Sequence, residues 1–275
     1  MGRVLAGKKE AIKKDNINKS AVIVIPAYKK SFSADEEQCV NTYFESFKNR
    51  DIYFTVPKSL DISYYESTFP GAGYMFFEDR FFKNITGYNR LLLDTGFYKA
   101  FADYEYMLIA QPDALLIKKE DIIDSFIEKG FDYYGAPWIP GRAIWEWVRV
   151  RRDIKEKGHI ICCKNKKHAI TMGNGGFSLR NTEKTIALIN EHSWRKIYWF
   201  IKRNEDIFFG VFGRDNSVDF KLAETNCGLE FSREYDLKEN LEKGNIPYGI
   251  HGYAKEFPTF NELKGFLTEK NIWTD

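Results

Sequence analysis

An α/β fold with a mainly parallel central sheet is predicted by three observations. Short apolar runs alternate with segments of helical spacing along the first half of the chain, as strands and helices do in this class. Each run is continuously apolar, which is typical of strands buried on both faces of a parallel sheet. The chain has 275 residues, of which 44% are hydrophobic, so it can form one large domain with a substantial core.

The individual elements follow from these patterns. The first strand is rich in β-branched residues and stops at Pro26, and the first helix is acidic at its start and basic at its end. The predicted strands are Ala21–Pro26, Ile52–Val56, Gly73–Phe77 and Tyr106–Ala110. The predicted helices are Asp35–Lys48, Tyr88–Ala102, Asp121–Lys129, Glu183–Glu191 and Asn261–Glu269.

Residues 1–20 and 138–167 depart from the alternating pattern. The first segment carries six basic and two acidic residues, which is typical of a solvated tail or a short leading helix. The second is basic and aromatic without a strand pattern, so we expect an irregular insertion. We therefore predict a single domain over residues 21–275, preceded by a tail and interrupted by this insertion.

The composition excludes several classes of protein. A formal net charge of +2 argues against a nucleic-acid binder, which usually has a basic surplus. The longest apolar run, Ala21–Tyr28, is too short to span a bilayer, and no hydrophobic signal segment opens the chain. The four cysteines have neither the density of a disulfide scaffold nor CxxC spacing. We therefore expect reduced thiols in a cytoplasmic protein.

The triplet Gln111-Pro112-Asp113 directly follows the fourth predicted strand. Open α/β sheets bind ligands beyond the carboxyl ends of their strands, where an aspartate can ligate a divalent cation. The alternative is that Asp113 caps the next helix or stabilises a turn.

A glycine-rich segment, Gly173-Asn174-Gly175-Gly176, precedes a run that reads as a strand. Three glycines in four residues allow the backbone to approach a ligand closely. The alternative is a glycine-rich hairpin or bulge without a ligand. The segment is neither a Walker loop nor a Rossmann fingerprint, because the residues that those motifs require do not follow it.

Two further motifs carry titratable groups. Glu205 and Asp206 head an aromatic segment, where paired carboxylates suit general-base catalysis or simply stabilise a helix start. His251 lies in Gly249–Tyr253 and is either a metal ligand, a phosphate contact or a structural histidine.

These motifs occur together and in order with others. The ordered pieces are Gln111–Asp113, Tyr134–Trp138, Gly173–Arg180, Asn204–Phe208, Ala223–Glu234 and Gly249–Tyr253. Together they resemble a bacterial and viral family that is catalogued as a domain of unknown function and regarded as glycosyltransferases. The resemblance covers about Ala21 to Tyr253. It implies a GT-A fold, a Rossmann-type α/β domain that uses a nucleotide-sugar donor, with a UDP-sugar as the first expectation.

The resemblance also implies a metal site. In GT-A enzymes an Asp-x-Asp triplet ends a central strand and holds Mn²⁺ or Mg²⁺ against the donor diphosphate. Here Gln111 replaces one of the two carboxylates of that triplet. Asp113 and His251 are the implied metal ligands, and some relatives use basic side chains in place of a metal.

The resemblance extends to catalysis and to the donor site. The Gly175-Gly176 pair resembles a strand that lines donor and acceptor in inverting galactosyltransferase-like enzymes, and Gln111 joins it as a donor contact. The Glu-Asp pair resembles the motif that holds the general base of those enzymes. Asp206 is therefore the implied base, with Glu205 as its helper, and the implied reaction inverts the anomeric centre.

Nucleotide contacts are expected at the first strand's end and at the following helix. The predicted residues are Pro26, Ala27, Tyr28, Asn89 and Arg90. An aromatic ring there can stack on a base, and a cation can meet a phosphate. Tyr88, in the same segment, is interpreted as packing in preference to binding.

The predicted function is transfer of a hexose from a nucleotide-sugar to a hydroxyl of a glycan or lipid-linked acceptor, in polysaccharide biosynthesis. The basic aromatic stretches Trp145–Arg152 and Trp194–Arg203 are either an acceptor or anionic-lipid contact, at the membrane periphery, or core aromatics with solvated cations. Two other functions stay open. One is a degenerate glycan- or lipid-binding module, and the other is a phosphoesterase with two metals.

Overall fold

The computed structural model describes residues 7–9, 18–138, 172–192, 194–202, 204–213 and 219–273. The predicted insertion, residues 138–167, lies outside the described residues apart from Trp138, and so does most of the predicted tail. Among the described residues, no helix has the length and apolar character that a membrane span requires.

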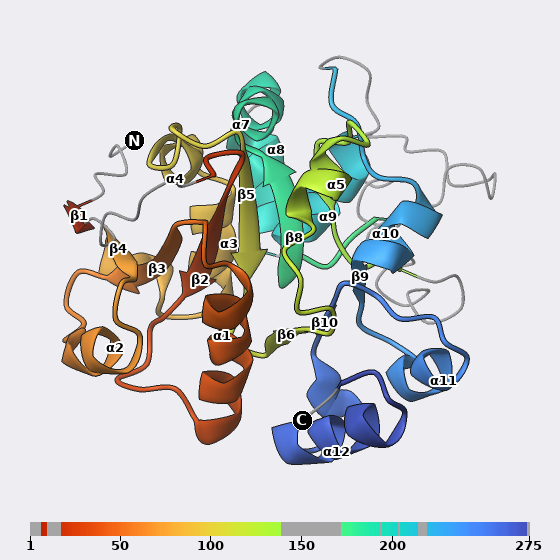
Figure 1. Ribbon diagram of the computed structural model, residues 1–275. Helices are drawn as coiled ribbons and strands as arrows, with labels where there is room; N and C mark the ends of the chain where they lie inside the picture. Colours follow the sequence, from red (N-terminus) through yellow and green to blue (C-terminus); the bar gives the residue numbers. More distant parts are fainter. Residues whose placement is uncertain are drawn as a thin grey trace.

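A seven-stranded mixed sheet forms the centre of the molecule (Figure 1). Its strands, in spatial order, are β1 (Gly7–Lys9), β4 (Gly73–Phe77), β3 (Ile52–Pro57), β2 (Ala21–Pro26), β5 (Tyr106–Ala110), β8 (Phe177–Asn181) and β7 (Tyr133–Tyr134). The four strands β4, β3, β2 and β5 are parallel, whereas β1 and β8 run antiparallel to their neighbours. The predicted α/β class, the four strands and the mainly parallel sheet are confirmed.

Helices pack around this sheet and around the smaller sheet described below. They are α1 (Ala34–Ser46), α2 (Ser63–Thr68), α3 (Ile85–Leu92), α4 (Thr95–Lys99), α5 (Ile123–Ile127), α7 (Thr182–Glu191), α8 (Trp194–Ile201), α9 (Glu205–Phe212), α10 (Thr225–Phe231), α11 (Leu237–Glu242) and α12 (Phe260–Glu269), with 3-10 turns η1 (Asp79–Phe81) and η3 (Tyr253–Lys255). The single helix predicted over Tyr88–Ala102 is wrong, because the chain forms α3 and α4 there. Asp94 makes the break, since its side chain accepts a hydrogen bond from Gly96 N at 2.8 Å and starts a new helix.

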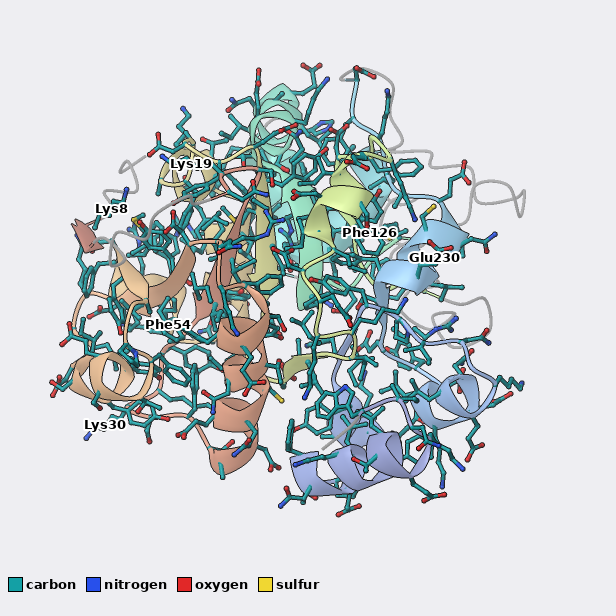
Figure 2. All side chains as sticks on the ribbon, in the orientation of Figure 1. Lys8, Lys19, Lys30, Phe54, Phe126 and Glu230 are labelled. Atoms are coloured by element: carbon teal, nitrogen blue, oxygen red, sulfur yellow. The ribbon has the colours of Figure 1, made fainter. Side chains whose placement is uncertain are left out.

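The high aromatic content fills the core between sheet and helices. Phe54 on β3 has the rings of Tyr65, Phe69 and Tyr74 within 5.3–5.8 Å (Figure 2). Phe126 on α5 packs against Phe231, with 5.1 Å between the two ring centroids. Figure 2 shows Phe126 far from Phe54, toward the opposite edge of the large sheet. Such large rings bury much apolar surface at fixed geometry, so they hold the elements in one arrangement.

A second, three-stranded sheet lies at the carboxyl-end side of the large one. Its order is β6 (Ala114–Leu116), β10 (Gly249–His251) and β9 (Ser232–Arg233), and α11 and α12 cover it (Figure 1). This unit has its own apolar cluster, which includes Leu115, Ile250, Leu263 and Trp273. The chain passes from β5 into β6 through Gln111–Asp113, so the two sheets meet at that triplet.

Candidate active site

An open pocket of about 370 Å³ lies beyond the carboxyl ends of β2 and β5. From β2 the strand order runs to β3 and β4 on one side and to β5 on the other. The pocket therefore lies at the point where the strand order reverses. Open α/β sheets bind ligands at such a point. Residues after both strands and at the start of α3 line the pocket, among them Tyr28, Lys29, Lys83, Tyr88, Gln111 and Asp113.

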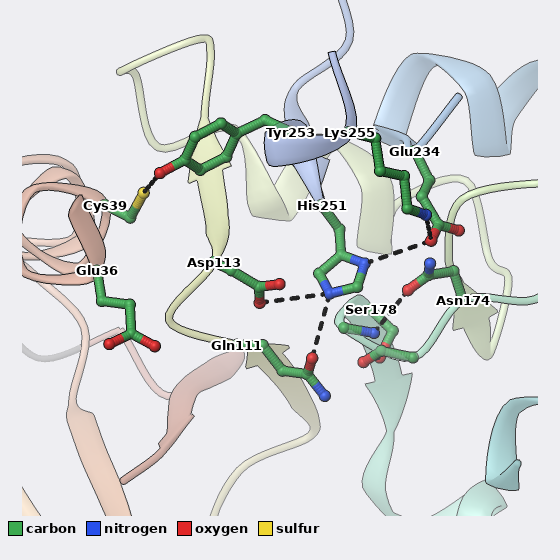
Figure 3. A network of polar contacts seen from close by, with 12 residues as sticks. Glu36, Cys39, Gln111, Asp113, Asn174, Ser178, Glu234, His251, Tyr253 and Lys255 are labelled. Carbon is green, nitrogen blue, oxygen red and sulfur yellow. Dashed lines mark hydrogen bonds and ion pairs between the residues drawn. The ribbon is translucent and has the colours of Figure 1, made fainter. Parts of the chain in front are cut away.

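Asp113 and His251 are brought together by the small sheet. Asp113 precedes β6, and β10 pairs with β6 so that His251 lies opposite Ala114. As a result His251 Nε2 lies 3.4 Å from Asp113 Oδ1 and 3.1 Å from Gln111 Oε1 (Figure 3). Burial alone would raise the pKa of Asp113, but the hydrogen bond and charge of His251 outweigh it, and the pKa is lowered.

The glycine pair forms a tight turn beside this cluster. Gly176 accepts a hydrogen bond from Gln111 N at 2.7 Å. A Cβ atom on Gly176 would lie less than 3.0 Å from His251 Nε2, and one on Gly175 equally close to Glu205 Oε1. Only glycine permits both approaches. The turn therefore joins the His251 cluster on one side to the Glu205 side chain on the other.

Glu205 forms a buried ion pair at the start of α9. Its Oε1 accepts a hydrogen bond from Arg180 Nη2 at 2.9 Å, and the Arg180 side chain is fully buried. Arg180 also donates to Ser178 Oγ and to Tyr98 Oη, and its guanidinium stacks on the ring of Phe209 at 4.8 Å. Removing one partner of such a pair leaves an uncompensated buried charge, which costs about 3–5 kcal/mol.

Asp206 has different surroundings from its neighbour. Burial raises its pKa to about 8, and the negative charges of Glu205 and Glu234 raise it as well, while Arg180 lowers it. Its Oδ1 accepts a hydrogen bond from Ile207 N at 2.7 Å. A carboxylate with a pKa near neutrality is suited to taking a proton during a reaction.

Some of the residues predicted as nucleotide contacts line the pocket, and others do not. Pro26 and Tyr28 line the pocket, whereas Ala27 is fully buried. Asn89 is only 1% exposed and donates a hydrogen bond to Ile201 O at 3.2 Å. The guanidinium of Arg90 lies 5.6 Å from the ring centroid of Trp194. Asn89 and Arg90 therefore do not line this pocket, and their role as nucleotide contacts stays a prediction.

The reason is the register of α3. Helical periodicity points Tyr88 toward the pocket and turns the next two side chains toward α8. Tyr88 lines the pocket, so its side chain is placed where a ligand could meet it, and the preference for packing over binding stays a prediction.

Several residues of the site were missed from the sequence. Lys29 and Lys83 line the pocket without belonging to any motif. Arg180 ends the glycine-rich motif and Glu234 ends the piece Ala223–Glu234, so both lie within motifs of the sequence, but the motifs predict no role for either residue. Isolated charged residues carry no sequence pattern, which is why no signal identified the two lysines.

Comparisons with known proteins agree with this architecture. No curated protein matches the chain. The galactosyltransferase LgtC, in complex with donor and acceptor sugar analogs, aligns over 92% of this chain and 96% of its own, with a TM-score of 0.54 and 14% identity. Mouse xyloside xylosyltransferase 1 aligns over 85% of this chain and 97% of its own, with a TM-score of 0.52 and 12% identity. The fold is thus that of the GT-A glycosyltransferases.

Family membership is also defined. Residues 72–251 match the family described as "Protein of unknown function (DUF5672)", which is more than half of the chain. The chain belongs to this family. Its matched region runs from just before β4 to His251 and so includes Asp113, the glycine pair and the Glu205–Asp206 pair.

Proposed function

We propose that the chain transfers a hexose from a nucleotide-sugar, with a UDP-sugar as the first candidate, to a hydroxyl of a glycan or lipid-linked acceptor. One observation carries the proposal. At the switch point of a GT-A fold, a single glycine turn holds the Asp113–His251 cluster on one side and the Glu205–Asp206 pair on the other. The Asp113–His251 cluster suits a cation that binds the donor diphosphate. The Glu205–Asp206 pair suits removal of a proton from the acceptor hydroxyl.

The residues near Asp113 fit a divalent cation. Neighbouring ligands on an octahedral ion with bonds of about 2.1 Å lie about 3.0 Å apart. His251 Nε2 lies at 3.1 and 3.4 Å from the oxygens of Gln111 and Asp113, close to that spacing. Within the described ranges no three acidic, histidine or cysteine side chains converge on one point, so the Gln111 amide oxygen would be the third protein ligand.

The described residues also supply positive charge without a metal. Lys29 and Lys83 both line the pocket, and Lys29 is held by an ion pair to Glu36 at 2.6 Å. We propose that they neutralise the donor phosphates in this pocket. When bound, Mn²⁺ or Mg²⁺ would add Lewis-acid stabilisation of the departing diphosphate. The ring of Tyr28, which is 52% exposed, is the candidate for stacking on the nucleobase.

In the proposed reaction Asp206 is the base. It takes the proton of the acceptor hydroxyl while that oxygen bonds to the anomeric carbon. The bond from the anomeric carbon to the diphosphate breaks, and its electron pair leaves with the diphosphate. Such a direct displacement inverts the anomeric centre. Glu205 is engaged by Arg180, so we assign it to orienting the acceptor and not to proton transfer.

A thermal-shift screen tests donor binding. Nucleoside diphosphates and nucleotide-sugars would be added with Mn²⁺, with Mg²⁺ and with chelator. A ligand that binds only the folded chain raises the melting temperature by mass action. At a concentration of 100 times its Kd it adds about 2.7 kcal/mol to the free energy of unfolding. We expect a shift with one nucleotide class that shrinks with chelator. The absence of any shift would contradict donor binding and favour the degenerate module.

A peripheral membrane contact is proposed from a different observation. On α8 the rings of Trp194 and Tyr198 are 39% and 47% exposed. Arg90 lies over the first ring, and the Nζ of Lys202 lies 4.8 Å from the centroid of the second. Exposed rings flanked by cations are typical of surfaces that rest on anionic lipid headgroups. The stretch Trp145–Arg152 lies outside the described residues.

A further inference from the structure

A second carboxylate faces His251 from the side away from the pocket. Glu234 directly follows β9, which runs parallel to β10 with Arg233 opposite Ile250. This register carries Glu234 alongside the imidazole ring, with its Oε1 3.9 Å from His251 Nδ1 (Figure 3). The Glu234 side chain is only 10% exposed.

Lys255 contacts the same carboxylate oxygen. Its Nζ forms a short ion pair with Glu234 Oε1, the atom that faces the imidazole. The ammonium also lies 4.3 Å from the ring centroid of Tyr235. Lys255 and His251 therefore face the same Glu234 oxygen, and the ammonium group neutralises part of the carboxylate charge.

The two nitrogens of His251 have distinct surroundings. Nε2 faces Gln111 and Asp113, whereas Nδ1 is buried and has no hydrogen-bond partner among the described residues. A cation that takes the lone pair of Nε2 requires the ring proton to be on Nδ1. That proton would point at Glu234, which is within 1 Å of hydrogen-bond distance.

We propose that Glu234 is the positioning residue that orients His251 for cation binding, and that Lys255 weakens this interaction by competing for the same oxygen. The proposal rests on the cation site proposed at Asp113 and His251. A carboxylate behind a ligating histidine typically contributes 10–100-fold in metal affinity. The two residues should therefore affect metal affinity in opposite directions.

The test is a Mn²⁺ titration of the full chain, with free Mn²⁺ measured by electron paramagnetic resonance. Glu234→Gln keeps the shape of the side chain but removes its charge, and we expect at least about tenfold weaker binding. Lys255→Met leaves the carboxylate to His251 alone, and we expect binding a few-fold tighter than in the unsubstituted chain.

The matched controls are Glu239→Gln and Lys243→Met. They remove the same charges from an exposed ion pair at the C-terminal end of α11, with 2.5 Å between Lys243 Nζ and Glu239 Oε1. Both should bind Mn²⁺ as the unsubstituted chain does. Glu234→Asp, which moves the carboxylate away from the ring, serves if the Gln variant does not fold, and should also weaken binding.

Three results would overturn the inference. One is unchanged Mn²⁺ affinity in the folded Glu234 variants. Another is equal weakening in the Glu234 and Lys255 variants, which would indicate a purely structural ion pair. The third is an unsubstituted chain that binds no Mn²⁺. Glycosyl transfer is judged separately, by donor turnover in the presence of chelator, so the proposed function can survive any of these outcomes.

Discussion

Glu205 and Asp206 are adjacent carboxylates with opposite roles in the electrostatics of the site. Arg180 neutralises the first through a 2.9 Å hydrogen bond, whereas burial raises the pKa of the second. The sequence could identify the pair but could not divide the work between its members, because Arg180 is 25 positions away and its contact depends on the sheet. This difference is the reason for proposing Asp206, and not Glu205, as the base.

The raised pKa of Asp206 predicts a pH-dependent stability. The unfolded chain releases this proton near pH 4, whereas the folded chain holds it to about pH 8. The folded state binds more protons in that window, so this group lowers stability as the pH rises from about 4 to about 8. Asp206→Asn removes the effect. The melting temperature of the variant, relative to the unsubstituted chain, should therefore rise steadily across this window.

The groups that face Asp206 are Glu205, Arg180 and Glu234, and all three are kept in this comparison. A difference in melting temperature that stays constant from pH 4 to pH 8 would contradict the raised pKa. In the proposed reaction the same ionisation would govern catalysis, since a base must be deprotonated. Turnover should therefore increase with pH up to about 8.

A single methyl group at Gly176 should disturb the cation cluster. In Gly176→Ala the new Cβ would lie less than 3.0 Å from His251 Nε2, so the ring must move. Overpacking of this kind costs about 1–3 kcal/mol. We expect lower stability in urea denaturation and weaker Mn²⁺ binding.

Gly265→Ala is the matched control for that variant. Gly265 lies within α12, and a Cβ there meets nothing within 4 Å. Alanine is the better helix former by up to about 1 kcal/mol, so this variant should equal or exceed the unsubstituted chain in stability. Equal behaviour of the two variants would show that the glycine turn does not constrain His251.

Among the elements, α8 carries Trp194 and Tyr198, the exposed aromatic residues on which the proposed membrane contact rests. Replacing both Trp194 and Tyr198 by alanine should reduce co-sedimentation with phosphatidylglycerol vesicles several-fold and leave the weak binding to phosphatidylcholine vesicles unchanged. Lys238→Gln with Lys270→Gln is the control, because these lysines lie 6.0 and 5.6 Å from the Phe266 ring on α12. Loss of binding in the lysine variant together with unchanged binding in the aromatic variant would indicate binding by general charge alone.

The elements differ in how far the sequence could predict them. Buried parallel strands such as β2 and β5 are continuous apolar runs, so local pattern sufficed. The split between α3 and α4 depends on the cap formed by Asp94, which is one polar residue within an apolar periodicity. The pairing of β6 with β10 joins segments over 130 residues apart, and each strand has three residues, too few for a pattern.

At the scale of the whole molecule, the site lies where two sheets meet. The large sheet supplies Gln111 at the end of β5, the small sheet supplies His251, and α9 supplies Asp206. The sequence motifs point to these residues, but they do not predict that the residues lie close together. Their proximity results from how the chain connects and pairs the strands of the two sheets. The two lysines of the pocket and Glu234 could not be assigned a role because their function depends on neighbours distant in sequence.

Phosphorus NMR of the chain with nucleotide-sugars, Mn²⁺ and a panel of hydroxyl acceptors tests the central claim most directly. Glycosyl transfer releases nucleoside diphosphate with its phosphates intact, and we expect this product from the unsubstituted chain at a rate at least 100-fold above that of Asp206→Asn. Release of nucleoside monophosphate and sugar phosphate would instead indicate a phosphoesterase. That result, or equal rates of diphosphate release by the two chains, would contradict the account.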